Sequence, residues 1–582
     1  MVSEPHLATG QEVELKLALP GGDVAQWARA LARVPALARH KAQQRQLHSV
    51  YYDTPDLRLC AQRAALRLRR VTDVEADVEA AAAANRAATH AAPAPERGQW
   101  LQALKTDGGD SALSQRGEWE SPVPGPALDI AALRALPAWL QLDPDGSIAT
   151  ALQPCFRTIC ERTTWTLRRR GGATIEVALD IGQIEAGERT EPIAEIELEL
   201  LAGAPADLFD LARQIAAHVA VLPLAASKAE RGFALAQGKL HAPRRARAPA
   251  LTPGQPLPAL AFAMLSEMWG QFSANLYALS QADDPELVHQ ARVGWRRLRS
   301  AQRLLRPALA QPDAPGRAQL APMLERLGAL RDLDVASTQV LPALRAAYLA
   351  ADAARVPVGA AGGVVVGEVA KEAPNGDLPA ESGAASPPDL QRAQDWLVAE
   401  QAFAQAAARE RAALRAALQQ PQTGLALLDL LHWLHLLTEP SAWAVASAAA
   451  PQESHASRRW LRRRMERLHA NWQRACAQAE QSGQVADLHR ARILAKRLRY
   501  NLEVLRPLLP PRMQRWLQEA TRLQQGVGVQ RDFVQAAVLA QRLAQQGALE
   551  RGIAEFLRGV AVGRAMAAQE GPQPSKQAAQ QR

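Results

Sequence analysis

Apolar and charged residues alternate with a period of two in several short runs within the first 240 residues. Such alternation is typical of a β-strand whose two faces meet different surroundings. The pattern predicts strands over 12–17, 65–70, 100–106, 117–121, 163–168, 174–181 and 193–201. Helical spacing of apolar residues appears between them at 23–39, 129–140 and 205–221. Residues 8–240 are therefore expected to form an α+β domain.

From about residue 258 onward the pattern changes to long helices rich in Ala, Leu, Arg and Gln. A Pro- and Arg-rich stretch at 241–257 indicates a linker, and 258–565 is expected to be all-α. The Gly-, Pro- and Ser-rich insert at 352–390 and the polar tail at 566–582 are expected to be disordered. Residues 288–307 and 488–507 are identical at nine of twenty positions, which predicts a duplicated helical bundle.

The charge of the 582-residue chain is unevenly distributed. Residues 1–240 hold 26 basic and 30 acidic residues, whereas the remainder holds 42 basic and 29 acidic residues, a net charge of +13. A strongly basic half indicates an anionic partner, such as polyphosphate, nucleic acid or a membrane surface. Because no charge-free stretch of about 18 apolar residues is present, no membrane span is expected.

The four cysteines show no metal-binding spacing, and the N-terminus has neither the basic nor the apolar region of a signal peptide. Both features fit a reducing cytosol. We therefore expect a cytoplasmic protein. If the basic half binds polyphosphate, polyphosphate granules are a candidate location.

Charged side chains recur on one face of strand after strand in the first domain. Glu12, Glu14 and Lys16 share a face because successive strand residues point to opposite sides. Near the end of the domain Glu195, Glu197 and Glu199 do the same. The further charged positions in such runs are Arg67, Arg69, Lys105, Glu118, Glu120, Arg162, Glu176 and Asp180. One run would indicate an ordinary sheet with a face in water, whereas the whole set suits the interior of a closed barrel.

Neighbouring glutamates on one strand face repel one another unless cations lie between them. Hard divalent cations with oxygen ligands, Mg²⁺ or Mn²⁺, are suited to that place. Lysines and arginines on the same face could then bind phosphate oxygens. A tunnel lined by both kinds of residue would hold a complex of metal and oligophosphate.

The run Glu12-x-Glu14-x-Lys16 resembles the ExExK signature of CYTH domains, the triphosphate tunnel metalloenzymes. Further matches follow in the same order along the chain: Tyr51-Tyr52-Asp53-Thr54-Pro55, Leu66-Arg67-Leu68-Arg69, Lys105, Arg116-Gly117-Glu118-Trp119-Glu120, Arg162, Asp180, Glu195-Ile196-Glu197-Leu198-Glu199 and Ser227-Lys228-Ala229-Glu230-Arg231-Gly232. The resemblance implies an eight-stranded antiparallel β tunnel barrel that hydrolyses a triphosphate with a divalent metal.

The resemblance also implies roles for individual residues. The expected catalytic residues are Glu12, Glu14, Lys16, Glu197 and Glu199. The expected ligands of Mg²⁺ or Mn²⁺ are Glu12, Glu14, Glu118, Glu120, Asp180, Glu195, Glu197 and Glu199. The expected phosphate-binding residues are Lys16, Arg67, Arg69, Lys105, Arg162 and Lys228.

The duplicated helical segments carry a histidine and several cations at equivalent helical positions. The first copy has His289, Arg292, Arg296, Arg299 and Arg303, and the second has His489, Arg492, Lys496 and Arg499. A basic run is usually a solvated helix face, but its duplication favours a binding function. These motifs resemble the CHAD domain, a conserved-histidine α-helical domain, which implies that this region binds inorganic polyphosphate.

The fusion of the two domains resembles the architecture of bacterial inorganic triphosphatases. It predicts hydrolysis of inorganic triphosphate to pyrophosphate and phosphate. Because the tunnel signature is shared, a thiamine triphosphatase, a nucleoside triphosphatase and an adenylyl cyclase stay open as alternatives. A non-catalytic polyphosphate-binding protein is a further alternative. A nucleic-acid binder is disfavoured, because the sequence contains no recognised nucleic-acid module.

Overall fold

The computed structural model of the chain describes residues 10–73, 98–106, 111–311, 313–350, 387–443 and 454–570. Most of the insert expected at 352–390 and of the tail expected at 566–582 therefore lies outside the described residues. Two of these expectations need correction at their edges. Helix α13 (Pro387–Leu418) already includes 387–390, and helix α18 (Arg551–Glu570) includes 566–570. Proline is compatible with the start of a helix, because the first helical amides lack intrahelical partners.

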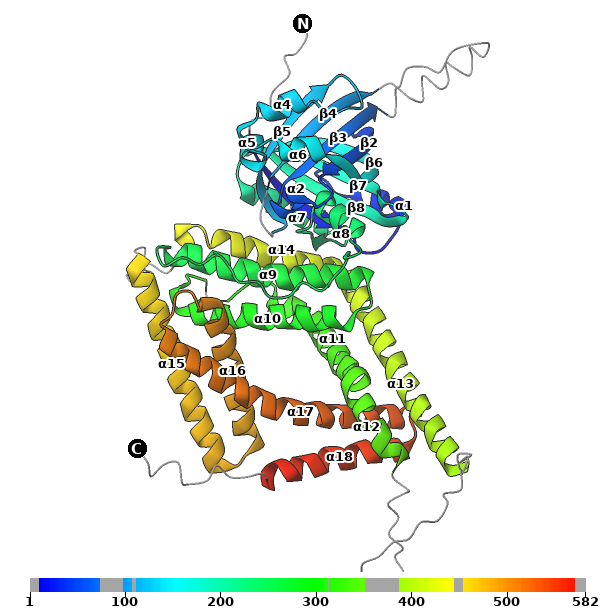
Figure 1. Cartoon of the computed structure of the whole chain (residues 1–582), viewed down its shortest axis with the longest axis vertical. Helices are drawn as coiled ribbons and strands as arrows, with labels where there is room; N and C mark the ends of the chain where they lie inside the picture. Colours follow the sequence, from blue (N-terminus) through cyan, green and yellow to red (C-terminus); the bar gives the residue numbers. More distant parts are fainter. Residues whose placement is uncertain are drawn as a thin grey trace, which may run out of the picture. The chain divides into compact units, whose positions relative to one another are not determined.

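Eight antiparallel strands within the described residues close into a barrel (Figure 1). They are β1 (Gly10–Ala18), β2 (Gln43–Asp53), β3 (Ala65–Asp73), β4 (Gln99–Lys105), β5 (Leu113–Val123), β6 (Gln153–Arg168), β7 (Thr174–Ala186) and β8 (Arg189–Ala202). Their order is β5-β4-β3-β2-β6-β7-β8-β1, and pairing of β1 with β5 closes the sheet. A short strand, β9 (Leu222–Pro223), adds to β1. The predicted eight-stranded antiparallel barrel is thus confirmed.

Strand β2 was not predicted from the pattern, and β6 begins ten residues before its predicted start. The first half of β2 is a polar run, and the buried face of early β6 includes the polar Thr158. Neither segment therefore shows the regular alternation of apolar and polar residues that predicts a strand. Two helices are shorter than their predicted ranges. Helix α1 (Val24–Leu31) ends before residue 39, and α7 (Pro205–Ala216) ends before residue 221. The segment 129–140 divides into α4 (Ile130–Arg134) and α5 (Pro137–Leu142).

The interior of the barrel has an apolar part, which is filled by helix α8 (Lys228–Ala236). Tyr51 stacks on Phe156 with ring centroids 4.5 Å apart, and Phe233 meets Phe156 edge-on at 4.9 Å. Gly232 permits this approach, because a Cβ at that position would lie 2.0 Å from the Phe156 ring. Helix α8 therefore occupies part of the barrel and leaves the remaining interior to charged residues.

Outside the barrel, short helices cover β3 and β4. Leu133, Trp139 and Ile148 of α4, α5 and α6 (Ser147–Ala151) pack with Leu66 and Leu104 in one buried cluster. The motif 51–55, which contains Asp53, has a structural role beside these helices. Its fully buried carboxylate accepts hydrogen bonds from the backbone amides of residues 54, 59 and 60, which fixes helix α2 (Arg58–Ala61).

After residue 256 all the long secondary-structure elements of the described residues are helices (Figure 1). They are α9 (Leu257–Gln281), α10 (Pro285–Leu305), α11 (Arg317–Val335), α12 (Leu341–Leu349), α13, α14 (Pro421–Leu436), α15 (Ser454–Ser482), α16 (Val485–Leu505), α17 (Gln514–Gln545) and α18. The chain divides into two compact units, 1–327 with 413–521 and 328–412 with 522–582. No helix among the described residues is both long and apolar enough to span a membrane.

The two repeated segments form helices α10 and α16, which pack against each other inside the first compact unit. Their contact includes a buried polar pair, in which Asn501 Nδ2 donates to Ser300 Oγ at 2.9 Å. Ser300 Oγ in turn donates to the backbone carbonyl of Arg497 at 3.2 Å. The sequence repeat therefore corresponds to two neighbouring helices.

Candidate functional site

Strand pairing brings the charged side chains of β1, β7 and β8 to one place inside the barrel. Glu14 lies opposite Glu199, and Lys16 lies opposite Glu197 on the neighbouring strand β8. Glu176 of β7 lies opposite Glu199 from the other side. Residues directly opposite on antiparallel strands point to the same face of the sheet. The alternation in the sequence thus becomes a continuous charged surface across three strands.

A cavity of about 1290 Å³ extends along this surface. Thirteen of the residues predicted for the tunnel line it: Glu12, Glu14, Lys16, Arg67, Arg69, Lys105, Glu118, Glu120, Arg162, Glu176, Glu197, Glu199 and Lys228. The two others, Asp180 and Glu195, are fully buried and are not part of its lining. The structure thus gathers the predicted residues in one place, but two of them lie beneath the surface of the cavity.

Asp180, Glu195 and Glu197 form an acidic cluster whose oxygens lie within 4.8 Å of one another. The Lys228 ammonium lies 2.6 Å from Asp180 Oδ2 and 2.8 Å from Glu197 Oε1, and it also pairs with Glu195. Arg162 donates to Asp180 through two nitrogens, at 2.7 and 2.6 Å. Burial alone would raise the pKa of Asp180, but Arg162 and Lys228 lower it. This cluster is therefore compensated by protein cations.

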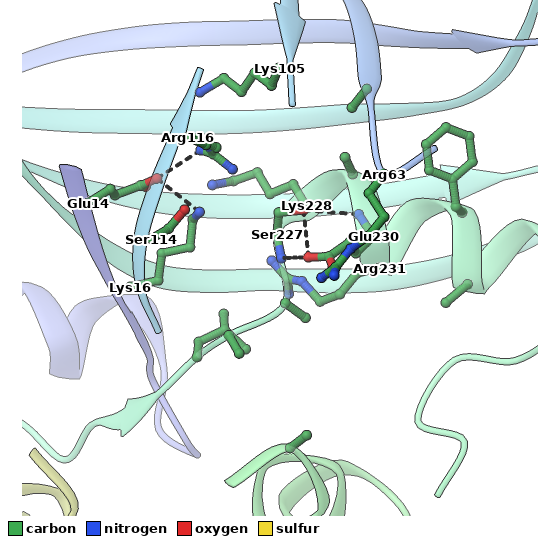
Figure 2. A pocket seen from close by; sticks show the side chains of 18 of the residues that line it. Glu14, Lys16, Arg63, Lys105, Ser114, Arg116, Ser227, Lys228, Glu230 and Arg231 are labelled. Carbon is green, nitrogen blue, oxygen red and sulfur yellow. Dashed lines mark hydrogen bonds and ion pairs between the residues drawn. The ribbon is translucent and has the colours of Figure 1, made fainter. Parts of the chain in front are cut away.

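Arg231 completes that buried network from the next turn of α8, where it pairs with Glu195. Ser227 caps the helix: its hydroxyl accepts from the Glu230 amide, and Glu230 Oε2 accepts from the Ser227 amide at 2.8 Å (Figure 2). This capping box fixes the first turn and so positions Lys228. Arg231 belongs to the motif 227–232 but had no predicted role, because only the fold shows which carboxylate it reaches.

A second group of carboxylates has an excess of negative charge. Burial, followed by the charges of Glu12, Glu176 and Glu14, raises the pKa of Glu199 to about 7. Burial is also the main cause that raises the pKa of Glu14, against the opposing effect of Lys16. Two like charges in a shared site disfavour ionisation of both. The region around Glu199 is therefore suited to a cation.

Arg116 connects two members of this group, although it was not among the predicted site residues. Its Nε donates to Glu12 Oε2 at 2.7 Å, and its Nη2 donates to Glu14 Oε2 at 2.8 Å. Figure 2 shows Glu14 between Arg116 and Lys16, whose ammonium lies 2.9 Å from Glu14. Arg116 shares the strand phase of its predicted neighbour Glu118, and that phase was the signal that could have given it a role. Glu176 was predicted to share the charged face with Asp180 but was given no metal-binding role.

Cations are in excess at another part of the same cavity. Arg67 pairs with Glu120 at 2.9 Å, and Lys105 pairs with Glu118 at 2.7 Å. Arg69 is different, because among the described residues its guanidinium donates to Ser49 Oγ and forms no ion pair with a carboxylate. Burial and the neighbouring Arg67 and Arg162 lower the pKa of Arg69. An anion at this position would relieve the repulsion.

The predicted polyphosphate-binding residues of α10 and α16 lie on the two packed helices, and most of them are partly buried or exposed. Burial and the charges of Arg317, Arg303 and Arg497 lower the pKa of Arg299 to about 10. Arg497, which was not predicted, belongs to this group, and its Nε is buried without a hydrogen-bond partner within the described part of the chain. Cations from both repeats thus repel one another.

Of that crowded group of arginines, Arg497 lines the same cavity as His489. This separate cavity of about 750 Å³ lies between α15 and α16, and Arg474 and Arg490 also line it. His289 is partly buried on α10 and is not part of that lining. The two histidines therefore occupy equivalent positions in sequence but different surroundings.

Two family models match the chain: residues 10–233 match the CYTH domain, and residues 263–543 match the CHAD domain. An inorganic triphosphatase from Haemophilus influenzae is 33% identical over 227 residues, which are 39% of this chain and 55% of that protein. The chain thus matches about half of the length of that relative.

Two solved structures are similar to parts of the chain. The CHAD domain from the plant Ricinus communis is 27% identical, with a TM-score of 0.42, over 58% of this chain and 95% of its own. A Hippeastrum adenylyl cyclase homologue, reported to have a dominant triphosphatase activity, is 18% identical, with a TM-score of 0.27, over 39% of this chain and 96% of its own.

Proposed function

Because the chain carries an N-terminal CYTH domain and a C-terminal CHAD domain, we propose that its barrel hydrolyses inorganic triphosphate to pyrophosphate and phosphate. One observation carries the proposal: a single cavity has excess positive charge near Arg69 and excess negative charge near Glu199. The first part suits phosphate oxygens, and the second suits a cation that accompanies them. Hydrolysis of a metal-bound oligophosphate needs both.

The chemistry of the donors fits a hard divalent cation, Mg²⁺ or Mn²⁺. We assign it to Glu12, Glu14, Glu176 and Glu199, because burial, followed by the charges of the other three carboxylates, raises the pKa of Glu199. The closer trio of Asp180, Glu195 and Glu197 is a weaker candidate, because the Lys228 ammonium contacts all three carboxylates. In the preferred group Glu12 and Glu14 also pair with cations, but Glu176 and Glu199 form no ion pair among the described residues. When bound, such an ion would neutralise phosphate oxygens and lower the pKa of a water ligand.

Hydrolysis consumes one water molecule and breaks one phosphoanhydride bond. A new P–O bond forms at the terminal phosphorus, and pyrophosphate leaves with the bridging oxygen. Arg67, Arg69 and Lys105 line the cavity and would bind the non-bridging oxygens, where negative charge is spread in the transition state. Because fixed cations need no reorganisation during the reaction, their contribution is larger than that of water in the same place.

The surroundings of the cavity favour an inorganic over an organic triphosphate. Tyr51 and Phe233 reach the cavity, but both rings pack on Phe156 within the apolar part of the barrel. Tyr277 also lines the cavity, where its hydroxyl accepts from Arg231 at 3.5 Å and its ring lies 6.0 Å from that of His241. The Tyr51 and Phe233 rings are therefore not free to stack on a base or a thiazolium ring, and Tyr277 is already in contact with Arg231. The test is a panel of kcat/KM values, measured by phosphate release, for inorganic triphosphate, ATP and thiamine triphosphate. Equal or faster hydrolysis of either organic substrate would favour the alternative enzymes.

We also infer that the helical region binds polyphosphate, since cations of α10 and α16 crowd together around Arg299. Linear polyanions release counterions on binding, and by analogy with single-stranded nucleic acid each neutralised phosphate adds about 0.7 to the log–log salt slope. Affinity at several salt concentrations should therefore fall steeply. Arg296→Gln with Arg303→Gln should weaken binding more than a control pair on the barrel, Arg33→Gln with Arg39→Gln. Equal losses would show that only the total charge matters.

A further inference from the structure

The lining of the cavity continues beyond the barrel onto the segment 239–247. Four cations of this segment line it, and we name them the basic collar: Lys239, Arg244, Arg245 and Arg247. Lys239, Arg245 and Arg247 are exposed, whereas Glu14 and Lys16 at the inner part of the cavity are each only 3% exposed. The basic collar therefore forms a solvent-exposed part of the same cavity.

This segment was expected to be a linker, but side chains of α9 hold it in place. Asn275 is fully buried; its Oδ1 accepts from the Arg244 amide at 3.1 Å, and its Nδ2 donates to the Arg244 carbonyl at 2.9 Å. Glu267 Oε1 accepts from the Arg247 amide at 2.7 Å. A Cβ at Gly270 would lie 2.9 Å from the Arg244 guanidinium, so a glycine leaves room for it. The collar is thus a positioned feature of the fold.

The charge of the basic collar differs from that of the inner cavity. Inside the barrel, carboxylates accompany most cations, whereas the sequence from 237 to 247 contains no acidic residue. Three carboxylates contact the segment among the described residues. Glu191 pairs with His241 at 3.2 Å, Glu267 accepts from the Arg247 amide, and Glu286 is 4.0 Å from the 79%-exposed Arg245. An exposed pair at that distance contributes little. The positive field that attracts polyanions is therefore assigned to Lys239, which donates to the neutral Gln237, and to the exposed Arg245.

The cavity of about 1290 Å³ exceeds the roughly 300–1,000 Å³ of most small-ligand pockets. It has room for more than the three phosphates that the inner residues would bind. We propose that the basic collar binds the fourth and later phosphates of a linear inorganic polyphosphate whose terminal phosphates occupy the inner cavity. This inference rests on the proposed function and extends it to the length of the substrate.

The chemistry of the ligand fits this arrangement. A linear polyphosphate carries about one negative charge per phosphate along a flexible chain, so its outer phosphates can follow exposed cations. Guanidinium groups bind phosphate oxygens through paired N–H donors. The reaction itself is unchanged: one water is consumed, one anhydride bond breaks, and the two products together contain all the phosphates of the substrate.

The test compares kcat/KM for linear tetraphosphate and for triphosphate in the full chain. The variant is Lys239→Gln with Arg245→Gln, and its matched control is Arg33→Gln with Arg39→Gln, which replaces exposed cations away from the cavity. An exposed charge contact contributes a factor of about 1.5 to 5. The collar variant should therefore lose about 2- to 25-fold in kcat/KM for tetraphosphate and little for triphosphate, whereas the control should lose neither.

Equal losses for the two phosphates, or no loss, would overturn the proposal. A selective loss for ATP would also overturn it, because the collar would then serve a nucleotide. If the unmodified protein hydrolyses neither phosphate, the proposed function fails while the collar can still be tested. The affinities of tetraphosphate and triphosphate, measured by calorimetry for the unmodified protein, the collar variant and its control, would then test the collar. The proposal stands only if the collar variant alone loses affinity selectively for tetraphosphate.

Discussion

Replacement of Glu199 by glutamine should stop turnover and yet stabilise the metal-free protein at alkaline pH. The pKa of Glu199 is about 7 in the folded protein, whereas the ordinary value is 4.5. As pH rises from 4.5 to 7, the unfolded chain ionises this group first, so the folded state loses stability over that interval. Glutamine keeps a similar shape, does not ionise, and removes this loss.

The difference of about 2.5 pKa units corresponds to about 3 kcal/mol at full effect. Partial solvation of the group reduces the expected gain to about 1–3 kcal/mol. For a domain of this size, each kcal/mol shifts the melting temperature by about 2–4 °C. Glu199→Gln should therefore melt roughly 2–12 °C higher than the unmodified protein at pH 8 and show little difference at pH 4.5.

The assay is thermal melting of the full chain in EDTA at both pH values, followed by the transition that includes the barrel. Glu188→Gln is the control, since this residue is exposed in the turn between β7 and β8. Excess Mg²⁺ or Mn²⁺ should stabilise the unmodified protein at pH 8 and stabilise Glu199→Gln less. The reasoning is refuted if Glu199→Gln melts lower at pH 8, or if its shift is the same at both pH values.

Two further substitutions test other parts of the barrel. Arg69→Ala should lower kcat/KM for triphosphate about 10- to 100-fold, since a hydrogen bond to a charged group contributes about 1.5–3 kcal/mol, and a loss below threefold would exclude it from the phosphate site. Gly232→Ala should lower the free energy of unfolding by about 1–3 kcal/mol, because its Cβ would overlap the Phe156 ring, and an unchanged melting temperature would contradict that packing.

The barrel was predictable from the sequence wherever one face of a strand is apolar and the other charged. Strands β1, β7 and β8 follow that rule, so their charged residues were assigned to the correct face. Strand β2 does not follow it, because its polar first half precedes consecutive aromatic residues. The rule therefore fails where polar residues are buried or where both faces are alike.

Strand phase gives the direction of a side chain but not its depth in a barrel. Asp180 and Glu195 were assigned to the same face as Glu197, and they do point inward. Their burial beneath Lys228 and Arg231 depends on α8, which is more than 30 residues from Glu195 in sequence. No local pattern reports where such a helix inserts. For the same reason the position of the basic collar beside the cavity could not be predicted.

The most direct measurement is release of phosphate and pyrophosphate from inorganic triphosphate by the full chain, for the unmodified protein and for Glu14→Gln. With Mg²⁺ or Mn²⁺, the unmodified protein should release the two products in equal amounts, and excess chelator should abolish the reaction. Glu14→Gln should remain folded and lose turnover, because it lacks a charge of the carboxylate group assigned to the metal. Unmodified rates in excess chelator, or in Glu14→Gln, would contradict the account.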